Sequence, residues 1–202
     1  MKVGIIGAGQ VGSATAFALI MRGVAREVVL IDYNQKKAEA EALDITHATT
    51  FAYASKVYAG NYADLKNADV VIITAGANQR PGETRIDLMS RNAAIFKSIV
   101  TPLMENAPDA IILVASNPVD IMTDYTLKLS GLPKNRVFGS GTILDTSRFR
   151  TLLGEHLGVS SKSIHANVLG EHGDSEVLIW SNGDAGTLPI ATLADDLKRP
   201  LS

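Results

Sequence analysis

The chain has 202 residues, of which 46% are hydrophobic, enough for one large or two small domains with a substantial core. Its 19 basic and 21 acidic residues give a net charge of −2, which indicates neither a nucleic-acid surface nor an anionic-membrane surface. The lack of cysteine excludes disulfides, thiolate chemistry and cysteine-ligated zinc. No apolar run approaches the roughly 20 residues of a membrane span, and glycines interrupt the apolar start, so we expect a soluble cytoplasmic protein.

The first predicted strand, Val3 to Gly7, runs directly into a glycine-rich turn. Gly7, Gly9 and Gly12 fit the pattern G-x-G-x-x-G, and apolar residues at helical spacing follow from Val11. The pattern alone is weak evidence, but its place between a strand and a helix is typical of a dinucleotide-binding loop. Glycines let the backbone approach a pyrophosphate, and a helix N-terminus directs N–H groups toward it.

A second buried strand, Val28 to Ile31, ends directly before Asp32, roughly 20 residues after Gly12. A carboxylate at this position can accept hydrogen bonds from the adenosine ribose. Its charge repels a 2′-phosphate, so the sequence predicts NAD rather than NADP. The alternative is a glycine-rich turn followed by a surface aspartate, which the complete order of strand, turn, helix, strand and acid disfavours.

Strands and helices continue to alternate as far as Gly139. We expect strands at 56–60, 70–74, 110–114 and 136–139, and helices at 34–47, 86–103 and 118–131, with Pro102 as a kink or late stop. The fully apolar run at 70–74 is typical of a parallel strand that is buried on both faces. The alternation predicts an α/β fold, a Rossmann-type doubly wound parallel sheet with right-handed crossovers.

The character of the chain changes after Ser140. A helix is predicted at 142–157, in which Thr142 and Asp145 resemble a capping box. Strands are predicted at 165–169 and 177–181, on either side of a turn that holds His172.

We therefore expect two domains, 1–140 and 141–202. The second is an incomplete α+β catalytic domain, small for an independent core. The segment after residue 181 is polar, with a weak apolar pattern between 188 and 197.

In an open parallel sheet, ligands bind beyond the carboxyl ends of the strands. Polar clusters of this sequence fall at such ends, at 7–12, 32, 75–85, 116–117 and 140. This coincidence is stronger evidence for a ligand site than any one motif.

Five motifs occur in the order that one family carries them. They are Gly-Ala-Gly-x-Val-Gly, Ala-Gly-Ala-Asn-Gln-Arg-Pro-Gly-Glu-Thr-Arg, Ser-Asn-Pro-Val-Asp, Gly-Ser-Gly-Thr-x-Leu-Asp-x-x-Arg and Gly-Glu-His-Gly-Asp-Ser-Glu. Over residues 1 to about 181 the chain resembles the lactate/malate dehydrogenase family, the bacterial L-lactate dehydrogenases most closely. The resemblance implies reversible hydride transfer between (S)-lactate or pyruvate and NAD.

On this resemblance, His172 is the acid–base catalyst, a role that suits imidazole because it ordinarily titrates near neutrality. Asp145 matches the carboxylate that fixes the imidazole tautomer, although it also reads as an acid stabilised in the first turn of a helix. Without the upstream motifs, a histidine in a glycine-flanked turn is more often an ordinary hydrogen-bonded loop residue.

Three further positions match substrate-binding residues. Arg148 matches the clamp on the substrate carboxylate, with an intrahelical pair to Asp145 as the alternative. Arg85 matches the arginine of a closing loop that polarises the reacting carbonyl, with a solvated surface residue as the alternative. Gln79 matches the position that reads the substrate side chain. Glutamine suits the methyl group of pyruvate and arginine suits oxaloacetate, so lactate is predicted over malate.

The resemblance also assigns the NAD site. Asn117 is shared with the substrate, Ser140 meets the nicotinamide carboxamide, and Tyr62 lies against adenine or, alternatively, packs as a surface residue. The assigned residues are Gly7, Gly9, Val11, Gly12, Asp32, Lys37, Tyr62, Gly76, Ala77, Ala115, Asn117 and Ser140. No metal is expected, because no histidine pair has ligand spacing and His172 with Asp174 alone is a poor metal site.

Arg150 and His165 match positions where allosteric bacterial lactate dehydrogenases bind fructose 1,6-bisphosphate between subunits. Two cationic groups suit a phosphate, especially where a twofold axis duplicates them. The alternative is two unrelated surface residues. The resemblance further implies a homo-oligomer, which is a tetramer in the family.

The second domain of the family continues well beyond residue 202, and the segment after Ser181 matches it poorly. Three interpretations stay open: a fragment of an L-lactate dehydrogenase, a shortened NAD-binding protein with little or no turnover, and a nucleotide-binding or assembly module with the same fold. The enzyme lineage is favoured because a binding module does not need the set Gln79, Arg85, Asp145, Arg148 and His172.

Overall fold

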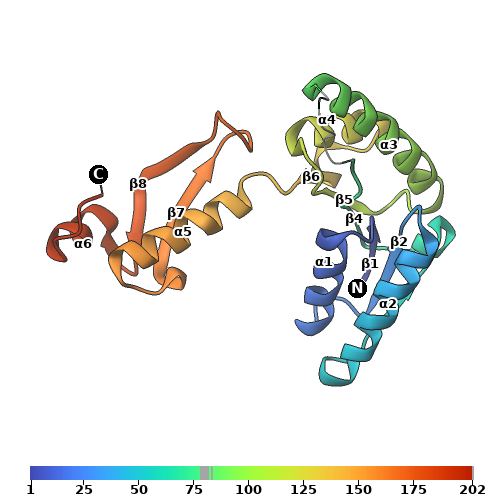
Figure 1. The fold of residues 1–202 in the computed structure, drawn as a ribbon, viewed down its shortest axis with the longest axis horizontal. Helices are drawn as coiled ribbons and strands as arrows, with labels where there is room; N and C mark the ends of the chain where they lie inside the picture. The colour runs from blue at the N-terminus through green and yellow to red at the C-terminus, as the bar shows by residue number, and fades with distance from the viewer. Residues whose placement is uncertain (78–81, 83, 202) are drawn as a thin grey trace. The chain divides into compact units, whose positions relative to one another are not determined.

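The computed structural model describes residues 1–77, 82 and 84–201 (Figure 1). They fall into two compact units, Met1–Gly139 and Ser140–Ser202. None of the helices in these described ranges combines the length and the apolar composition that a transmembrane span needs.

A parallel sheet forms the centre of the first unit. From edge to edge, its described strands are β3 (Lys56–Ala59), β2 (Glu27–Ile31), β1 (Lys2–Ile6), β4 (Val70–Ile73), β5 (Ile111–Val114) and β6 (Val137–Gly139). The chain moves outward from β1 to β3 and then returns to β4, so the strand order reverses between β1 and β4. The doubly wound fold predicted from the sequence is confirmed, and the predicted strand ends lie within one residue of the observed ones.

Helices cover both faces of this sheet. They are α1 (Gln10–Met21), α2 (Gln35–Ala48), α3 (Arg85–Asn106) and α4 (Val119–Ser130), with short 3-10 helices at Thr49–Phe51, Tyr62–Leu65 and Lys134–Arg136. Ile5 packs in a core with α1 and α2, whereas its neighbour Ile6 packs in a core with α3 and α4. Because successive strand residues point to opposite faces, the apolar strands serve two cores at once.

Two helix boundaries differ from the sequence-based predictions. Pro102 does not stop α3, which continues to Asn106, and Leu103 in its last turns is fully buried. Pro118 is the N-cap of α4 rather than its first residue. At the start of α3, Thr84 and Asp87 form a capping box, and the hydrogen bonds from Thr84 lower the pKa of Asp87.

The second unit packs helices against an antiparallel sheet. Its elements are α5 (Ile143–Leu157), a 3-10 helix (Ser161–Ser163), β7 (Ile164–Leu169), β8 (Val177–Ala185), β9 (Leu188–Pro189) and α6 (Ile190–Asp196), with the strand order β7-β8-β9. Buried and exposed residues alternate along β7, so one face carries Ile164, Ala166 and Val168 into a core with Phe149. β8 runs past the predicted end at residue 181 because Ala185 pairs with Ile164.

The capping box predicted for Thr142 and Asp145 is wrong. Thr142 is the N-cap residue of α5, but within the described residues its side chain makes no capping bond. Its hydroxyl donates instead to the backbone oxygen of Val168 in β7, at 2.7 Å. The Thr142 hydroxyl therefore makes a tertiary hydrogen bond to β7 instead of the local bond that the sequence predicts at the end of the helix.

Close packing at Gly12 generates a stability prediction. A Cβ atom at Gly12 would lie 1.9 Å from the backbone oxygen of Gly7 and 2.8 Å from Thr74 Oγ1. We expect Gly12→Ala to lower the free energy of unfolding by about 1–3 kcal/mol, measured by urea denaturation followed with circular dichroism.

Gly9→Ser is the matched control in the same turn. A Cβ at Gly9 has no atom of the described residues within 4 Å of it outside its own chain neighbours, and serine is favoured at an N-cap. We expect its stability to stay within about 0.5 kcal/mol of the original chain. Equal losses in the two variants would contradict the packing argument.

Candidate functional site

The glycine-rich loop lies at the switch point of the sheet, between β1 and α1. Gly7 adopts a φ of +111°, and a Cβ there would lie 2.6 Å from the backbone nitrogen of Ala75. The loop is therefore packed directly onto the backbone after β4, while Gly9 faces open space within the described residues. A backbone that is closed on one side and open on the other, at a helix N-terminus, fits a pyrophosphate group.

In the structure, the Asp32 carboxylate accepts two backbone hydrogen bonds that the sequence did not predict. Its Oδ2 accepts a hydrogen bond from the backbone nitrogen of Ala8 at 2.8 Å, and its Oδ1 accepts one from Asn34 at 2.9 Å. The carboxylate thus ties the end of β2 to the glycine-rich loop. Because each carboxylate oxygen can accept a second hydrogen bond, Asp32 can still receive a ribose hydroxyl.

Two buried side chains join the loops after β4 and β5: Asn92, which the sequence analysis missed, and Ser116, which it placed in a polar cluster at a strand end. Asn92 accepts from the backbone nitrogen of Ala77 at 2.8 Å and donates to the backbone oxygen of Asn117 at 3.1 Å. Ser116 donates to the backbone oxygen of Ala75 at 2.7 Å. The only sequence signal for Asn92 is a polar residue directly before the apolar Ala93 in α3, which does not reveal its partners.

The remaining cofactor candidates of the first unit occupy varied environments. Val11 and Gly76 are exposed, and so is Asn117. Tyr62 is half-buried against the core that the sheet forms with α3 and α4, and this burial raises the pKa of its hydroxyl. Lys37 is exposed in the first turn of α2. Most of these candidates therefore follow the carboxyl ends of β1, β2, β4 and β5, as expected for this topology.

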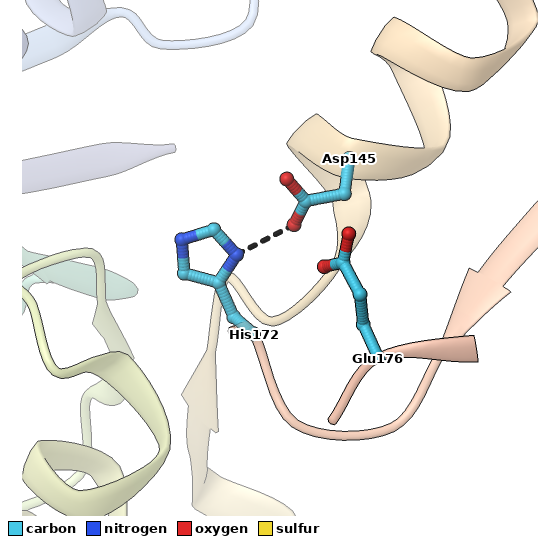
Figure 2. Close-up of side chains that lie close together, drawn as sticks. All are labelled: Asp145, His172 and Glu176. Atoms are coloured by element: carbon cyan, nitrogen blue, oxygen red, sulfur yellow. Dashed lines mark hydrogen bonds and ion pairs between the residues drawn. The ribbon is translucent and has the colours of Figure 1, made fainter. Parts of the chain in front are cut away.

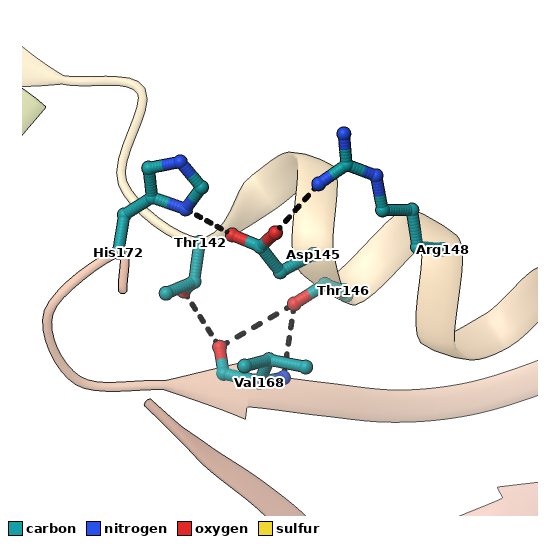
Figure 3. A network of polar contacts seen from close by, with 6 residues as sticks. All are labelled: Thr142, Asp145, Thr146, Arg148, Val168 and His172. Carbon is teal, nitrogen blue, oxygen red and sulfur yellow. Dashed lines mark hydrogen bonds and ion pairs between the residues drawn. The ribbon is translucent and has the colours of Figure 1, made fainter. Parts of the chain in front are cut away.

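In the second unit, His172 and Asp145 come together from a turn and a helix. His172 Nδ1 lies 2.6 Å from Asp145 Oδ2, and the side chains are 27% and 9% exposed (Figure 3). A carboxylate can only accept, so this contact places the imidazole proton on Nδ1 when Asp145 is ionised. Nε2 is then the ring nitrogen that can take up a proton from a substrate.

Arg148 pairs with the second oxygen of the same carboxylate. Its Nη1 lies 3.1 Å from Asp145 Oδ1, and its side chain is 62% exposed (Figure 3). This contact is the intrahelical pair that the sequence analysis gave as the alternative role. It engages one guanidinium nitrogen, and the exposed remainder has the donors that a substrate carboxylate requires, so the two roles are compatible.

Glu176 is a second acidic neighbour of His172, to which the sequence analysis assigned no role. Ligand atoms of Asp145, His172 and Glu176 all lie within 4.8 Å of one another (Figure 2). Nevertheless, His172 Nδ1 and Asp145 Oδ2 share a hydrogen bond, and Asp145 Oδ1 pairs with Arg148. A metal ion would have to disrupt these contacts, so we assign none to this cluster.

The described part of the structure does not include the side chains of two predicted substrate residues. Gln79 lies outside the described residues. The backbone of Arg85 begins α3, but its side chain is likewise outside the described part. Both assignments remain predictions.

Arg150 is held against β7. Its Nε donates to the backbone oxygen of Ala166 at 2.8 Å, and its Nη2 donates to Asn167 Oδ1 at 3.0 Å. His165 is exposed on β7, as is Asn167. Arg150 also lines a groove of about 460 Å³ between α5 and β7.

Comparison with known families matches both units. Residues 1–139 match the NAD binding domain of lactate/malate dehydrogenase, and residues 142–199 match the alpha/beta C-terminal domain of lactate/malate dehydrogenase.

Individual curated relatives are named L-lactate dehydrogenase. The chain is 56% identical over 202 residues to an L-lactate dehydrogenase of Allorhizobium ampelinum and 55% identical over 202 residues to one of Thermus aquaticus. It is covered completely in both comparisons and spans 65% of the length of each relative.

Solved structures agree in fold. A lactate dehydrogenase from a Medee basin deep-sea metagenome library superposes with a TM-score of 0.94 at 45% identity. The minor L-lactate dehydrogenase of Enterococcus mundtii, in a ligands-bound form, does so with a TM-score of 0.94 at 48% identity. Each comparison covers 98% of this chain and 64% of the other.

The contacts of Asp32 predict a local effect on the glycine-rich loop. Asp32→Ala removes the acceptor of the Ala8 amide, so this amide should exchange with solvent roughly 10- to 100-fold faster. Amide hydrogen exchange followed by NMR measures this. Asp64→Ala, which removes a comparable 2.9 Å bond from the Asn61 amide, should leave Ala8 unchanged. Unaltered exchange of Ala8 in Asp32→Ala would show that Asp32 does not hold the loop.

Proposed function

Because the chain belongs to the lactate/malate dehydrogenase family, we propose that it is an NAD-dependent L-lactate dehydrogenase, which interconverts (S)-lactate and pyruvate. The observation that carries the proposal is the 2.6 Å contact between His172 Nδ1 and Asp145 Oδ2. Acid–base exchange with a substrate hydroxyl needs an imidazole in a fixed tautomer. The curated relatives named L-lactate dehydrogenase support the choice of substrate.

The proposed acid–base step uses His172 Nε2. When bound, NAD supplies the hydride acceptor. The side chains of this chain accept and return the proton. In lactate oxidation, the hydroxyl proton passes to Nε2 as the carbon-bound hydrogen leaves with its electron pair. In pyruvate reduction, Nε2 returns the proton to the carbonyl oxygen. The negative charge of the Asp145 carboxylate stabilises the imidazolium that forms.

The proposed substrate site adds Arg148, Arg85, Gln79 and Asn117. Arg148 holds the substrate carboxylate with guanidinium donors that Asp145 does not use. Arg85 stabilises negative charge that develops on the reacting oxygen. Gln79 contacts the methyl group of pyruvate, because a neutral amide leaves the second carboxylate of oxaloacetate without a charged partner.

The residues proposed to bind NAD belong to the first unit, with the addition of Ser140. The glycine-rich loop takes the pyrophosphate, Asp32 takes the adenosine ribose and Tyr62 borders the adenine. The fit is supported by the open space at Gly9 and by the closed packing at Gly7. The complete proposed set is Gly7, Gly9, Val11, Gly12, Asp32, Lys37, Tyr62, Gly76, Ala77, Ala115, Asn117 and Ser140.

Regulation and assembly form a finer part of the proposal. We propose a cytoplasmic homo-oligomer that binds fructose 1,6-bisphosphate through Arg150 and His165. Support comes from the bond of Arg150 to Asn167. This bond holds the guanidinium against β7, on which both Asn167 and His165 are exposed. Charge-assisted bonds from a guanidinium to a phosphate are strong enough to compete with its present neutral acceptors.

The central test is pyruvate-dependent oxidation of NADH by the 202-residue chain. We expect turnover, with kcat/KM higher for pyruvate than for oxaloacetate. His172→Asn should lower kcat roughly 10²- to 10⁴-fold because it removes the acid–base group. NADH affinity, measured by calorimetry, should stay unchanged.

His156→Asn is the matched control, since His156 lies in α5 and contacts the backbone oxygen of Pro200. It should retain the original kcat. A lack of pyruvate-dependent oxidation, or full activity of His172→Asn, would contradict the proposed function.

A separate test addresses regulation. Fructose 1,6-bisphosphate should lower the KM for pyruvate by roughly fivefold or more, an ordinary allosteric coupling. His165→Gln should abolish this response without altering basal activity, whereas Lys162→Gln, at an exposed lysine, should preserve it. An unchanged KM in the presence of the sugar bisphosphate would rule out regulation of this kind.

A further inference from the structure

The end of β7 is fastened to α5 by two threonine hydroxyls. Among the described strands, β7 pairs only with β8, so its other edge presents backbone groups without strand partners. At Val168, Thr146 Oγ1 accepts from the backbone nitrogen at 2.9 Å, and Thr142 Oγ1 donates to the backbone oxygen at 2.7 Å (Figure 3). Both backbone groups of one buried residue are thus satisfied by the same helix.

These hydroxyls lie on one side of α5, and Asp145 stands between them in the sequence. Residues separated by four positions share a helix face. One turn beyond Thr146, Arg150 Nε donates to the backbone oxygen of Ala166 at 2.8 Å. Three consecutive turns of α5 therefore bind the open edge of β7, and the first two turns flank the carboxylate that contacts His172.

Thr142 shows that this contact replaces a local one. An N-cap threonine ordinarily accepts a bond from a backbone N–H of the first helical turn. Within the described residues, Thr142 makes no such bond, and its hydroxyl is directed to β7 instead. Among the described contacts, the α5 helix therefore lacks a side-chain capping bond from Thr142, and the end of β7 is hydrogen-bonded to the helix instead.

The turn beyond Val168 contains two glycines with positive φ. Gly170 and Gly173 adopt φ values of +104° and +155°, and glycine has the widest conformational freedom of any residue. The turn leaves β7 at Leu169 and carries His172 back to Asp145 on α5. The distance between imidazole and carboxylate therefore depends on how firmly the strand end is held to the helix.

We propose that Thr146, assisted by Thr142, is a positioning residue for His172. It acts through the backbone of Val168, which fixes the start of the turn against the helix that carries Asp145. The consequence for catalysis rests on the proposed function. The consequence for the contact between His172 and Asp145 does not depend on it.

The test compares Thr146→Val with Thr146→Ser. Valine keeps the shape but removes the hydroxyl, whereas serine restores it. The first readout is the NMR signal of the His172 Nδ1 proton, which its hydrogen bond to Asp145 shifts downfield. We expect Thr146→Val to lose this signal through exchange with solvent, and Thr146→Ser to retain it.

The second readout is pyruvate reduction. We expect kcat of Thr146→Val to fall roughly 10- to 100-fold, because a small misplacement of a catalytic group is costly. KM and the Kd for NADH should change less than about twofold, and Thr146→Ser should recover kcat. Thr151→Val is the matched control, since Thr151 Oγ1 bonds only within α5, to the backbone oxygen of Ser147 at 2.9 Å among the described contacts.

Each outcome bears on the proposal. Persistence of the Nδ1 proton signal in Thr146→Val would overturn it, even in a chain without turnover. A kcat loss that serine does not recover, or one that Thr151→Val shares, would also overturn it. If Thr146→Val does not fold, Thr142→Val decides, because it removes the 2.7 Å bond to the Val168 oxygen and leaves that oxygen only the 3.4 Å bond from Thr146 Oγ1. An unchanged His172 signal in that variant would overturn the proposal.

Discussion

The buried carboxylate of Asp145 imposes the main constraint on the second unit. Only 9% of this side chain is exposed, and a charge at such a position is costly unless its oxygens have partners. One oxygen meets His172 and the other meets Arg148. The requirement for partners therefore brings an imidazole from a distant turn and a guanidinium from the same helix to one carboxylate. The tautomer of the imidazole follows from that arrangement.

The first unit satisfies a carboxylate in a similar way. The two oxygens of Asp32 receive the backbone N–H groups of Ala8 and Asn34. In both units, an acid near the end of a regular element hydrogen-bonds to a segment that contains glycine. Glycine permits the close approach and the acid limits the freedom that glycine introduces. A preorganised site needs this combination, because its polar groups must be in place before the ligand arrives.

The two sites differ in where their supporting contacts come from. The loops of the first unit are joined by buried polar side chains, Asn92 and Ser116, beneath the carboxyl ends of adjacent strands. In the second unit, Thr142 and Thr146 hold the edge of a strand to a helix. These four residues lie beside the proposed ligand-binding groups and restrict their movement. Positioning groups of this kind explain how an open surface keeps a fixed geometry.

Sequence by itself determined the alternation of strands and helices, the glycine-rich fingerprint with Asp32, and the family motifs, because each is encoded in local spacing or residue type. Tertiary structure alone decided that Thr142 bonds Val168 instead of capping its own helix, and that Glu176 lies beside His172. The contact between His172 and Asp145 joins residues separated by 27 positions. Resemblance suggested this pairing, but the spacing could not, because side chains so far apart in sequence meet only when a helix and a strand pack together.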